Sequence, residues 1–151
     1  MKYVLDTNLY VRYFRAPHQD EWWQSAERFV IGFTSMLYLH SVVAFELLSG
    51  AITPELERET RRTLLGPLER RGRVITPRHG AWERAAAALT ELIAARKLSP
   101  GPGITKSLVN DSLIAASARD DGFTLITENT KDFALLQPLL PIEVVAPWPR
   151  P

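Results

Sequence analysis

Three acidic residues and one amide, far apart in the sequence, have the clearest capacity for chemistry. Asp6 follows a short apolar run, Glu46 stands in an otherwise apolar stretch, Asp111 lies in a polar triplet, and Asn129 follows another apolar run. A lone carboxylate among apolar residues is destabilising, and several carboxylates in one desolvated cleft repel each other. A hard divalent cation such as Mg²⁺ removes that repulsion and prefers oxygen ligands. The four residues therefore predict a metal site, provided that the fold brings them together.

Each of these residues also has a simpler structural role open to it. Asp6 and Asn8 can cap the helix that follows them, and the triplet around Asp111 is a good helix start. Glu46 can be an exposed helix residue, and Asn129 can be a turn residue or a cap. The case for chemistry therefore depends on the four residues taken together.

The elements that must position these side chains are short strands alternating with helices. Apolar runs predict strands at residues 2–5, 37–43, 74–75, 123–127 and 142–145. Helical spacing and capping signals predict helices at residues 8–15, 20–31, 44–50, 54–71, 81–97, 108–119 and 131–136. Pro and Gly predict a loop at residues 99–103 and an irregular, Pro-rich tail from about residue 147. This alternation predicts an α/β fold with a mainly parallel central sheet and helices on both faces.

In such folds ligands bind beyond the carboxyl ends of the strands. Asp6, Glu46 and Asn129 all come after predicted strands, and Asp111 begins the helix before the strand at residues 123–127. We therefore expect the four side chains to converge on one edge of the sheet.

Length and composition restrict the remaining possibilities. The 151 residues suit one domain spanning residues 1–151. A formal net charge of +1 argues neither for nor against a nucleic-acid partner. The lack of cysteine excludes disulfides, thiolate zinc sites and a cysteine nucleophile. We find no signal peptide and no apolar stretch of membrane-spanning length, so we expect a cytoplasmic protein without a membrane partner.

Other acidic-pocket proteins fit the sequence less well. A receiver-like signalling domain needs paired acids after its first strand, and Asp6 has no acidic neighbour. A phosphatase with an aspartyl nucleophile needs a second Asp two positions later, where Asn8 stands. His18, His40 and His79 lie on unrelated segments, so we interpret them as surface or packing residues rather than catalysts.

The sequence resembles the PIN-domain ribonucleases, and among them the VapC-like toxins of type II toxin–antitoxin systems. Residues 3–8 (YVLDTN) resemble the first PIN motif and residues 41–50 (SVVAFELLSG) the second. Residues 110–118 (NDSLIAASA) resemble the third and residues 124–133 (TLITENTKDF) the fourth. The motifs stand in the expected order and span nearly the whole chain.

The resemblance implies a three-layer α/β/α domain that holds Mg²⁺ or Mn²⁺ in an acidic cleft. It also implies a metal-dependent endoribonuclease that cleaves RNA, a cognate antitoxin protein as partner, and a homodimer. Asp6, Glu46 and Asp111 match the acidic positions of the family and are expected to bind the metal.

Asn129 falls where many relatives carry a fourth acid, and we assign it to the catalytic group. Thr7, Asn8 and Thr127 are expected to orient the ligands or the phosphate, and Asp132 is the nearest further carboxylate. Because an amide binds a metal less strongly than a carboxylate, Asn129 leaves an alternative open. The chain could be a degenerate PIN module that binds RNA or protein without cleavage.

Overall fold

Five short strands form the centre of the fold. The computed structural model describes residues 1–97 and 103–148. The strands are β1 (Tyr3–Leu5), β2 (Leu37–His40), β3 (Val74–Ile75), β4 (Thr124–Ile126) and β5 (Glu143–Val145). They pair in the order β3-β2-β1-β4-β5, and every pair is parallel. The predicted parallel sheet is confirmed, and its carboxyl ends all lie at one edge.

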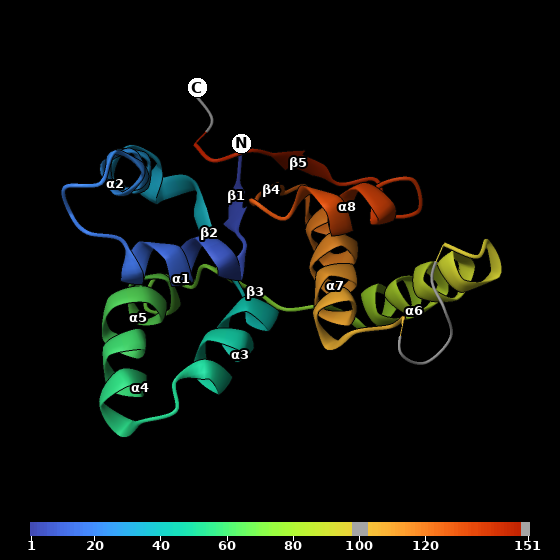
Figure 1. Ribbon diagram of the computed structural model, residues 1–151, viewed down its shortest axis with the longest axis horizontal. Helices are drawn as coiled ribbons and strands as arrows, with labels where there is room; N and C mark the ends of the chain where they lie inside the picture. Colours follow the sequence, from blue (N-terminus) through green and yellow to red (C-terminus); the bar gives the residue numbers. More distant parts are fainter. Residues whose placement is uncertain (98–102, 149–151) are drawn as a thin grey trace.

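Helices cover the sheet on both sides. They are α1 (Thr7–Arg15), α2 (Glu21–Phe33), the short 3-10 helix η1 (Thr34–Met36), α3 (Ser41–Gly50), α4 (Pro54–Thr60), the π-helical segment η2 (Arg61–Leu65), α5 (Gly66–Glu69), α6 (His79–Ala94), α7 (Lys106–Asp121) and α8 (Thr130–Leu136). In Figure 1, α1 and α2 lie to the left of the strands and α6 and α7 to the right. This arrangement confirms the predicted three-layer α/β/α fold.

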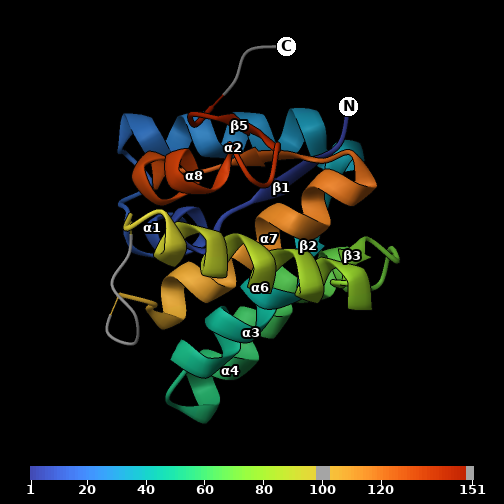
Figure 2. The same cartoon turned by 90° about the vertical axis from the view of Figure 1, so that its right-hand side faces the viewer.

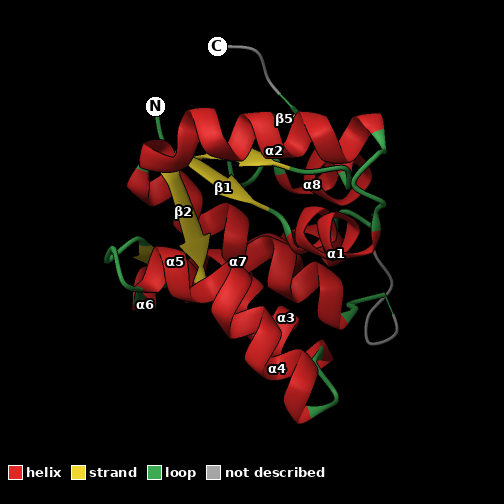
Figure 3. Cartoon of the chain, turned by 90° about the vertical axis from the view of Figure 1, so that its left-hand side faces the viewer, coloured by secondary structure: helices red, strands yellow, loops and turns green. Residues whose placement is uncertain are grey.

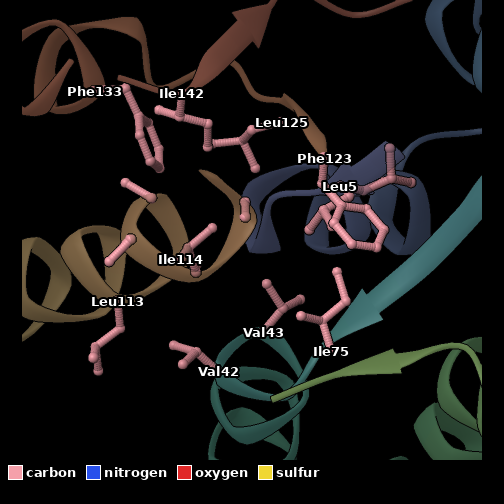
Figure 4. Close-up of a cluster of buried hydrophobic side chains, with 14 of the residues drawn as sticks. Leu5, Val42, Val43, Ile75, Leu113, Ile114, Phe123, Leu125, Phe133 and Ile142 are labelled. Carbon is pink, nitrogen blue, oxygen red and sulfur yellow. The ribbon is translucent and has the colours of Figure 1, made fainter. Parts of the chain in front are cut away.

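Helix α7 runs through the interior and carries Asp111, one of the two most buried acids of the site. All side chains from Asn110 to Ala118 are buried, because α6 packs along one side of the helix (Figure 2) and β4 along another. Figure 4 shows Ile114 of α7 near Leu125 and Phe133 within one apolar cluster. A helix buried all round must also bury its polar residues, so Asp111 is forced out of bulk water.

Two predicted element boundaries are wrong, for local reasons. The strand predicted at residues 37–43 ends at His40, because the Nδ1 atom of His40 accepts a hydrogen bond from the Val42 amide and caps α3. The helix predicted to start at residue 108 begins at Lys106, since the Thr105 hydroxyl caps it by accepting from the Leu108 amide. Asp111 is therefore inside the helix, and its capping role is excluded.

The helix predicted at residues 54–71 is interrupted in its middle. A stretch of π-helix, η2, separates α4 from α5. Of the predicted loop at residues 99–103, residues 99–102 lie outside the described residues, as do the tail residues 149–151. Within the described part of the chain, no helix has the length and apolar character needed to cross a membrane.

Candidate active site

A cleft of about 820 Å³ brings the four predicted side chains together. Its lining is formed mainly by α1 and the residues on either side of it, with two residues from α7 and one each from α3 and the loop after β4. Figure 3 shows why these elements meet: β1 and β2 run side by side, and α1 continues directly from the end of β1. Asp6, Glu46, Asp111 and Asn129 all line this cleft.

Asp6 caps a helix and also lines the cleft. One carboxylate oxygen accepts from the Thr7 amide (2.7 Å) and caps α1. The other oxygen accepts from the Thr127 hydroxyl (2.6 Å) and the Asn8 amide group (2.9 Å). Thr127 and Asn8 therefore hold the Asp6 carboxylate in a fixed orientation, and Asp6 is only 4% exposed.

Glu46 is held by two donors from different helices. Its Oε2 atom accepts from the Thr7 hydroxyl of α1, and its Oε1 atom accepts from the Asn110 amide group of α7 (2.7 Å). Thr7 thus orients the Glu46 carboxylate. Asn110 was not predicted as a site residue; its position next to Asp111 within the third motif was the available signal.

Asn129 joins two acids rather than capping α8. Its Nδ2 atom donates to Asp111 and to Asp132, at 3.1 Å each, and its side chain makes no cap contact with the helix. Its backbone amide donates to the Thr127 hydroxyl (2.8 Å). The structure therefore places Asp132 beside the cluster, linked to Asp111 through this one amide.

Burial and mutual repulsion act on the two most buried acids. Burial raises the pKa of Asp111 to about 8, with further contributions from the nearby carboxylates of Asp6, Asp132 and Glu46. Burial also raises the pKa of Asp6, and the charge of Glu46 adds to this effect, although hydrogen bonds from Thr127 and Thr7 oppose it. The environment of the cluster therefore disfavours the ionised form of both acids when no cation is bound.

The carboxylate, amide and hydroxyl oxygens of the cleft are the kind of ligand that a hard divalent cation prefers. Within residues 1–97 and 103–148, no three His, Asp or Glu side chains lie close enough together to hold a metal ion jointly. The predicted three-carboxylate centre therefore stays a prediction. Mg²⁺ is commonly held by only one or two carboxylates and several waters, a requirement that Asp6 and Asp111 can meet.

An unsatisfied oxygen beside Asp6 supports the same fit. The Oδ1 atom of Asn8 is buried and has no hydrogen-bond partner among the described residues. Its amide nitrogen is already used, donating to Asp6 and, at 3.2 Å, to Thr127. Buried acceptors are rarely left unpaired, and a water carried by a bound cation would supply the missing donor.

The three histidines lie where the sequence suggested. His40 is fully buried, whereas His18 and His79 are exposed. None of the described residues that line the cleft is a histidine. The chemistry of the cleft therefore rests on carboxylates, amides and hydroxyls.

Several solved structures share this fold. A chain of the DNA-bound VapBC complex from Salmonella typhimurium superposes with a TM-score of 0.70 at 23% sequence identity, covering 97% of this chain and 98% of that one. A chain of VapBC2 from Rickettsia felis, bound to a promoter DNA fragment, gives 0.68 at 24%, with coverages of 97% and 98%. A toxin–antitoxin complex from Klebsiella pneumoniae gives 0.63 at 24%, with coverages of 99% and 100%. These likenesses establish the fold.

No curated protein sequence matches the chain significantly. The family assignment comes instead from the sequence pattern of the PIN domain, which matches residues 3–137 and so includes all four motifs and every acid of the cleft. With the parallel sheet and the acidic cleft at its carboxyl edge, this match leads to one conclusion: the chain belongs to the PIN domain family.

Proposed function

We propose that this chain is a Mg²⁺- or Mn²⁺-dependent endoribonuclease and the toxin of a toxin–antitoxin pair. The observation that carries the proposal is the pair of buried acids, Asp6 and Asp111, whose pKa values are raised in a cleft that they share with Glu46. A bound cation would favour the ionised form of both acids, which burial and the neighbouring carboxylates otherwise oppose. Membership of the PIN domain family supports a nuclease in general.

In this proposal Asp6 and Asp111 hold the cation, and Glu46 completes its shell or orients the attacking water. When bound, the cation lowers the pKa of a water molecule and polarises a phosphoryl oxygen. Thr7 and Asn110 fix the Glu46 carboxylate from two sides. Thr127 and Asn8 do the same for Asp6, so both acids are oriented before substrate arrives.

Water is the proposed nucleophile rather than the ribose 2′-hydroxyl. The 2′-hydroxyl route is commonly served by a pair of histidines as base and acid, and the described lining of the cleft contains no histidine. Attack by water in line with the departing ribose oxygen leaves a 5′-phosphate and a 3′-hydroxyl. Cleavage of cellular RNA implies that the protein acts in the cytoplasm.

The proposed partners follow from the likeness to toxin–antitoxin complexes. The solved structures named above are complexes of VapBC or toxin–antitoxin type. We propose a cognate antitoxin protein for this chain and a homodimeric toxin. Co-expression with the neighbouring reading frame, followed by size-exclusion chromatography with light scattering, tests both parts.

The test of catalysis is cleavage of single-stranded RNA by the purified protein with Mg²⁺, Mn²⁺ or EDTA, with mapping of the product ends. We expect cleavage only with the cations, and loss of it in Asp6→Asn, Glu46→Gln and Asp111→Asn. Parallel calorimetric titration with Mn²⁺ measures cation binding directly. A protein that binds RNA but cuts none under any of these conditions would instead be the non-cleaving module that Asn129 leaves open.

A further inference from the structure

The wall of the cleft formed by α1 changes from acidic to basic along its length. Asn8, Arg12 and Arg15 are spaced by four and three residues, so they share one face of the helix, and all three line the cleft. Arg12 stands about 6 Å along the helix axis from Asn8, given the rise of about 1.5 Å per residue. A guanidinium is thus presented one helical turn away from the acidic cluster.

The Arg12 side chain is held in a defined position, although it is 45% exposed. Its guanidinium carbon lies 4.3 Å from the centre of the Trp22 ring, within the range of a cation–π contact. Its Nη1 atom donates to Oε1 of Glu128, and the same oxygen accepts from the Trp22 indole nitrogen (3.1 Å). Three side chains from α1, α2 and the loop after β4 therefore form one closed unit.

This unit is tied to the acidic cluster through the backbone. Glu128 directly precedes Asn129, the residue that donates to Asp111. The position of the Arg12 guanidinium and that of the Asp111 carboxylate are thus set by neighbouring residues of one loop. A long, flexible side chain at a cleft rim is not usually restrained in this way, since fixing it removes rotamer freedom.

We propose that Arg12 binds a phosphate of the RNA strand next to the acidic cluster, with Trp22 and Glu128 as the residues that position it. This inference rests on the proposed nuclease function, because it names a contact to that enzyme's substrate. An acidic cleft repels the phosphates on either side of the scissile bond, so the strand needs a cationic anchor nearby. A guanidinium has five N–H donors, so it can bind Glu128 through one edge and a phosphate through another.

Two other charged residues that line the cleft, Asp20 and Arg15, are less suited than Arg12 to bind the phosphate next to the acidic cluster. Asp20 also lines the cleft, but its carboxylate is used at the start of α2, where it accepts from the Trp22 amide (2.7 Å). Arg15 shares the helix face with Arg12 and stands further from the acids, so it serves as an internal comparison. We expect it to contact a more distant phosphate, with a smaller effect on binding.

The experiment measures binding of a fluorescein-labelled single-stranded RNA by anisotropy, in EDTA and over a range of KCl concentrations. Each phosphate contact that is lost lowers the slope of log Kd against log salt by about 0.7 for a single strand. We expect Arg12→Gln to weaken binding by roughly tenfold, as for loss of a charge-assisted hydrogen bond, and to lower the slope by this amount. Arg12→Lys keeps the charge but not the flat fork that stacks on Trp22, so we expect a wild-type slope with intermediate affinity.

The matched control is Arg58→Gln, an exposed arginine of α4 that pairs with Glu55, and it should leave affinity and slope unchanged. In cleavage assays Arg12→Gln should raise KM and leave kcat near its wild-type value, because the lost contact is present before and during the reaction. Wild-type affinity and slope in Arg12→Gln would overturn the assignment, as would failure of the wild-type protein to bind RNA at all. Arg12-dependent RNA binding without any cleavage would overturn the nuclease proposal and leave the Arg12 contact standing.

Discussion

Two of the polar residues that helix α7 buries, Ser117 and Asp111, lie about two turns apart and have opposite surroundings. Near one end, Ser117 donates to the Leu113 carbonyl (2.6 Å) and pairs with His40 (2.5 Å). The other ring nitrogen of His40 accepts from the Val42 amide. Every donor and acceptor of this pair is used, and burial lowers the pKa of His40 to about 4, so the ring is neutral at pH 7.

Near the other end, Asp111 is 5% exposed, and among the described residues its one side-chain donor is the amide of Asn129. Its neighbours Asp6, Asp132 and Glu46 carry the same charge and add to the rise in its pKa. A buried polar pair whose hydrogen bonds are made within the protein fits a structural role, whereas a buried acid whose ionisation is opposed by burial and by neighbouring carboxylates is a candidate ligand for a cation. The comparison separates a structural pair from a candidate binding site on one helix.

The largest expected effect comes from removing the unsatisfied charge. Asp111→Asn keeps the shape of the side chain and removes the carboxylate, so we expect cation-dependent RNA cleavage to fall by at least two orders of magnitude, since removal of a key electrostatic group has effects of this size. The variant should fold, and in EDTA it should be more stable than the wild type, because like-charge repulsion is relieved. Cleavage rates and urea denaturation measure the two effects.

Asp121→Asn is the matched control for that variant. Asp121 ends the same helix and pairs with the exposed Arg78, so we expect little change in either measurement. Full activity in Asp111→Asn would end its assignment to the site, whatever its stability.

The buried pair of His40 and Ser117 predicts how the free energy of unfolding depends on pH. Because the pKa of His40 is lowered in the folded state, the unfolded state binds more protons between about pH 4 and pH 6.5, so stability is full above that window and is lost as the pH falls through it. A shift of this size corresponds to about 3 kcal/mol. His40→Asn keeps a side chain that can cap α3 but does not titrate, and should lack this loss.

The measurement is the free energy of unfolding in urea from pH 7 to pH 4, compared between the two proteins. The raised pKa values of Asp6 and Asp111 act in the opposite direction, but they act equally in both proteins and cancel in the difference. The exposed His79→Gln is the control and should follow the wild type. Equal pH dependence in wild type and His40→Asn would show that His40 is not held neutral.

Cation binding should stabilise the folded protein through Asp111 and not through the His40–Ser117 pair at the other end of α7. At a Mn²⁺ concentration of 100 times Kd we expect about 2.7 kcal/mol of added stability in the wild type, and none in Asp111→Asn. Ser117→Ala leaves the His40 ring without its partner and should lower stability by about 1–3 kcal/mol, yet retain the full cation effect. Thermal unfolding with and without Mn²⁺ distinguishes them, and loss of the cation effect in Ser117→Ala would contradict the separation of the two ends.

Features of the fold that depend on local interactions could be predicted from the sequence, whereas features that depend on contacts between distant residues could not. Periodicity predicted the sheet, its parallel strands and most of the helices, because apolar spacing is local. The π-helical turn at Arg61–Leu65 could not be predicted, since its residues are all compatible with an α-helix. The predicted start of α7, residue 108, is two residues too late. Thr105 is a good cap residue, but it follows closely on the loop that Pro and Gly predict at residues 99–103.

The site could be predicted only as a set of candidate positions. Resemblance pointed to Asp6, Glu46 and Asp111, and the three acids do share a cleft. Contacts between distant residues had no local signal: Asn110 with Glu46, and Arg12 with Glu128, depend on how α7 and the loop after β4 approach the neighbouring helices. The number of residues that bind the metal stays a prediction, because no three acids among the described residues lie close enough together to hold an ion jointly.

The smallest expected effect concerns the amide between the two acids. Asn129→Ala removes the donor that links Asp111 and Asp132, but no carboxylate, so we expect less than a tenfold loss of cleavage. Asn129→Asp adds a further charge to the cluster, so it should lower stability in EDTA and tighten Mn²⁺ binding in a calorimetric titration. If Asn129→Asp instead weakened Mn²⁺ binding, the amide would be supplying something that a carboxylate cannot. A donor that holds Asp111 in place is the only such function that its contacts provide, so Asn129 would then be a positioning residue rather than a substitute for a fourth acid.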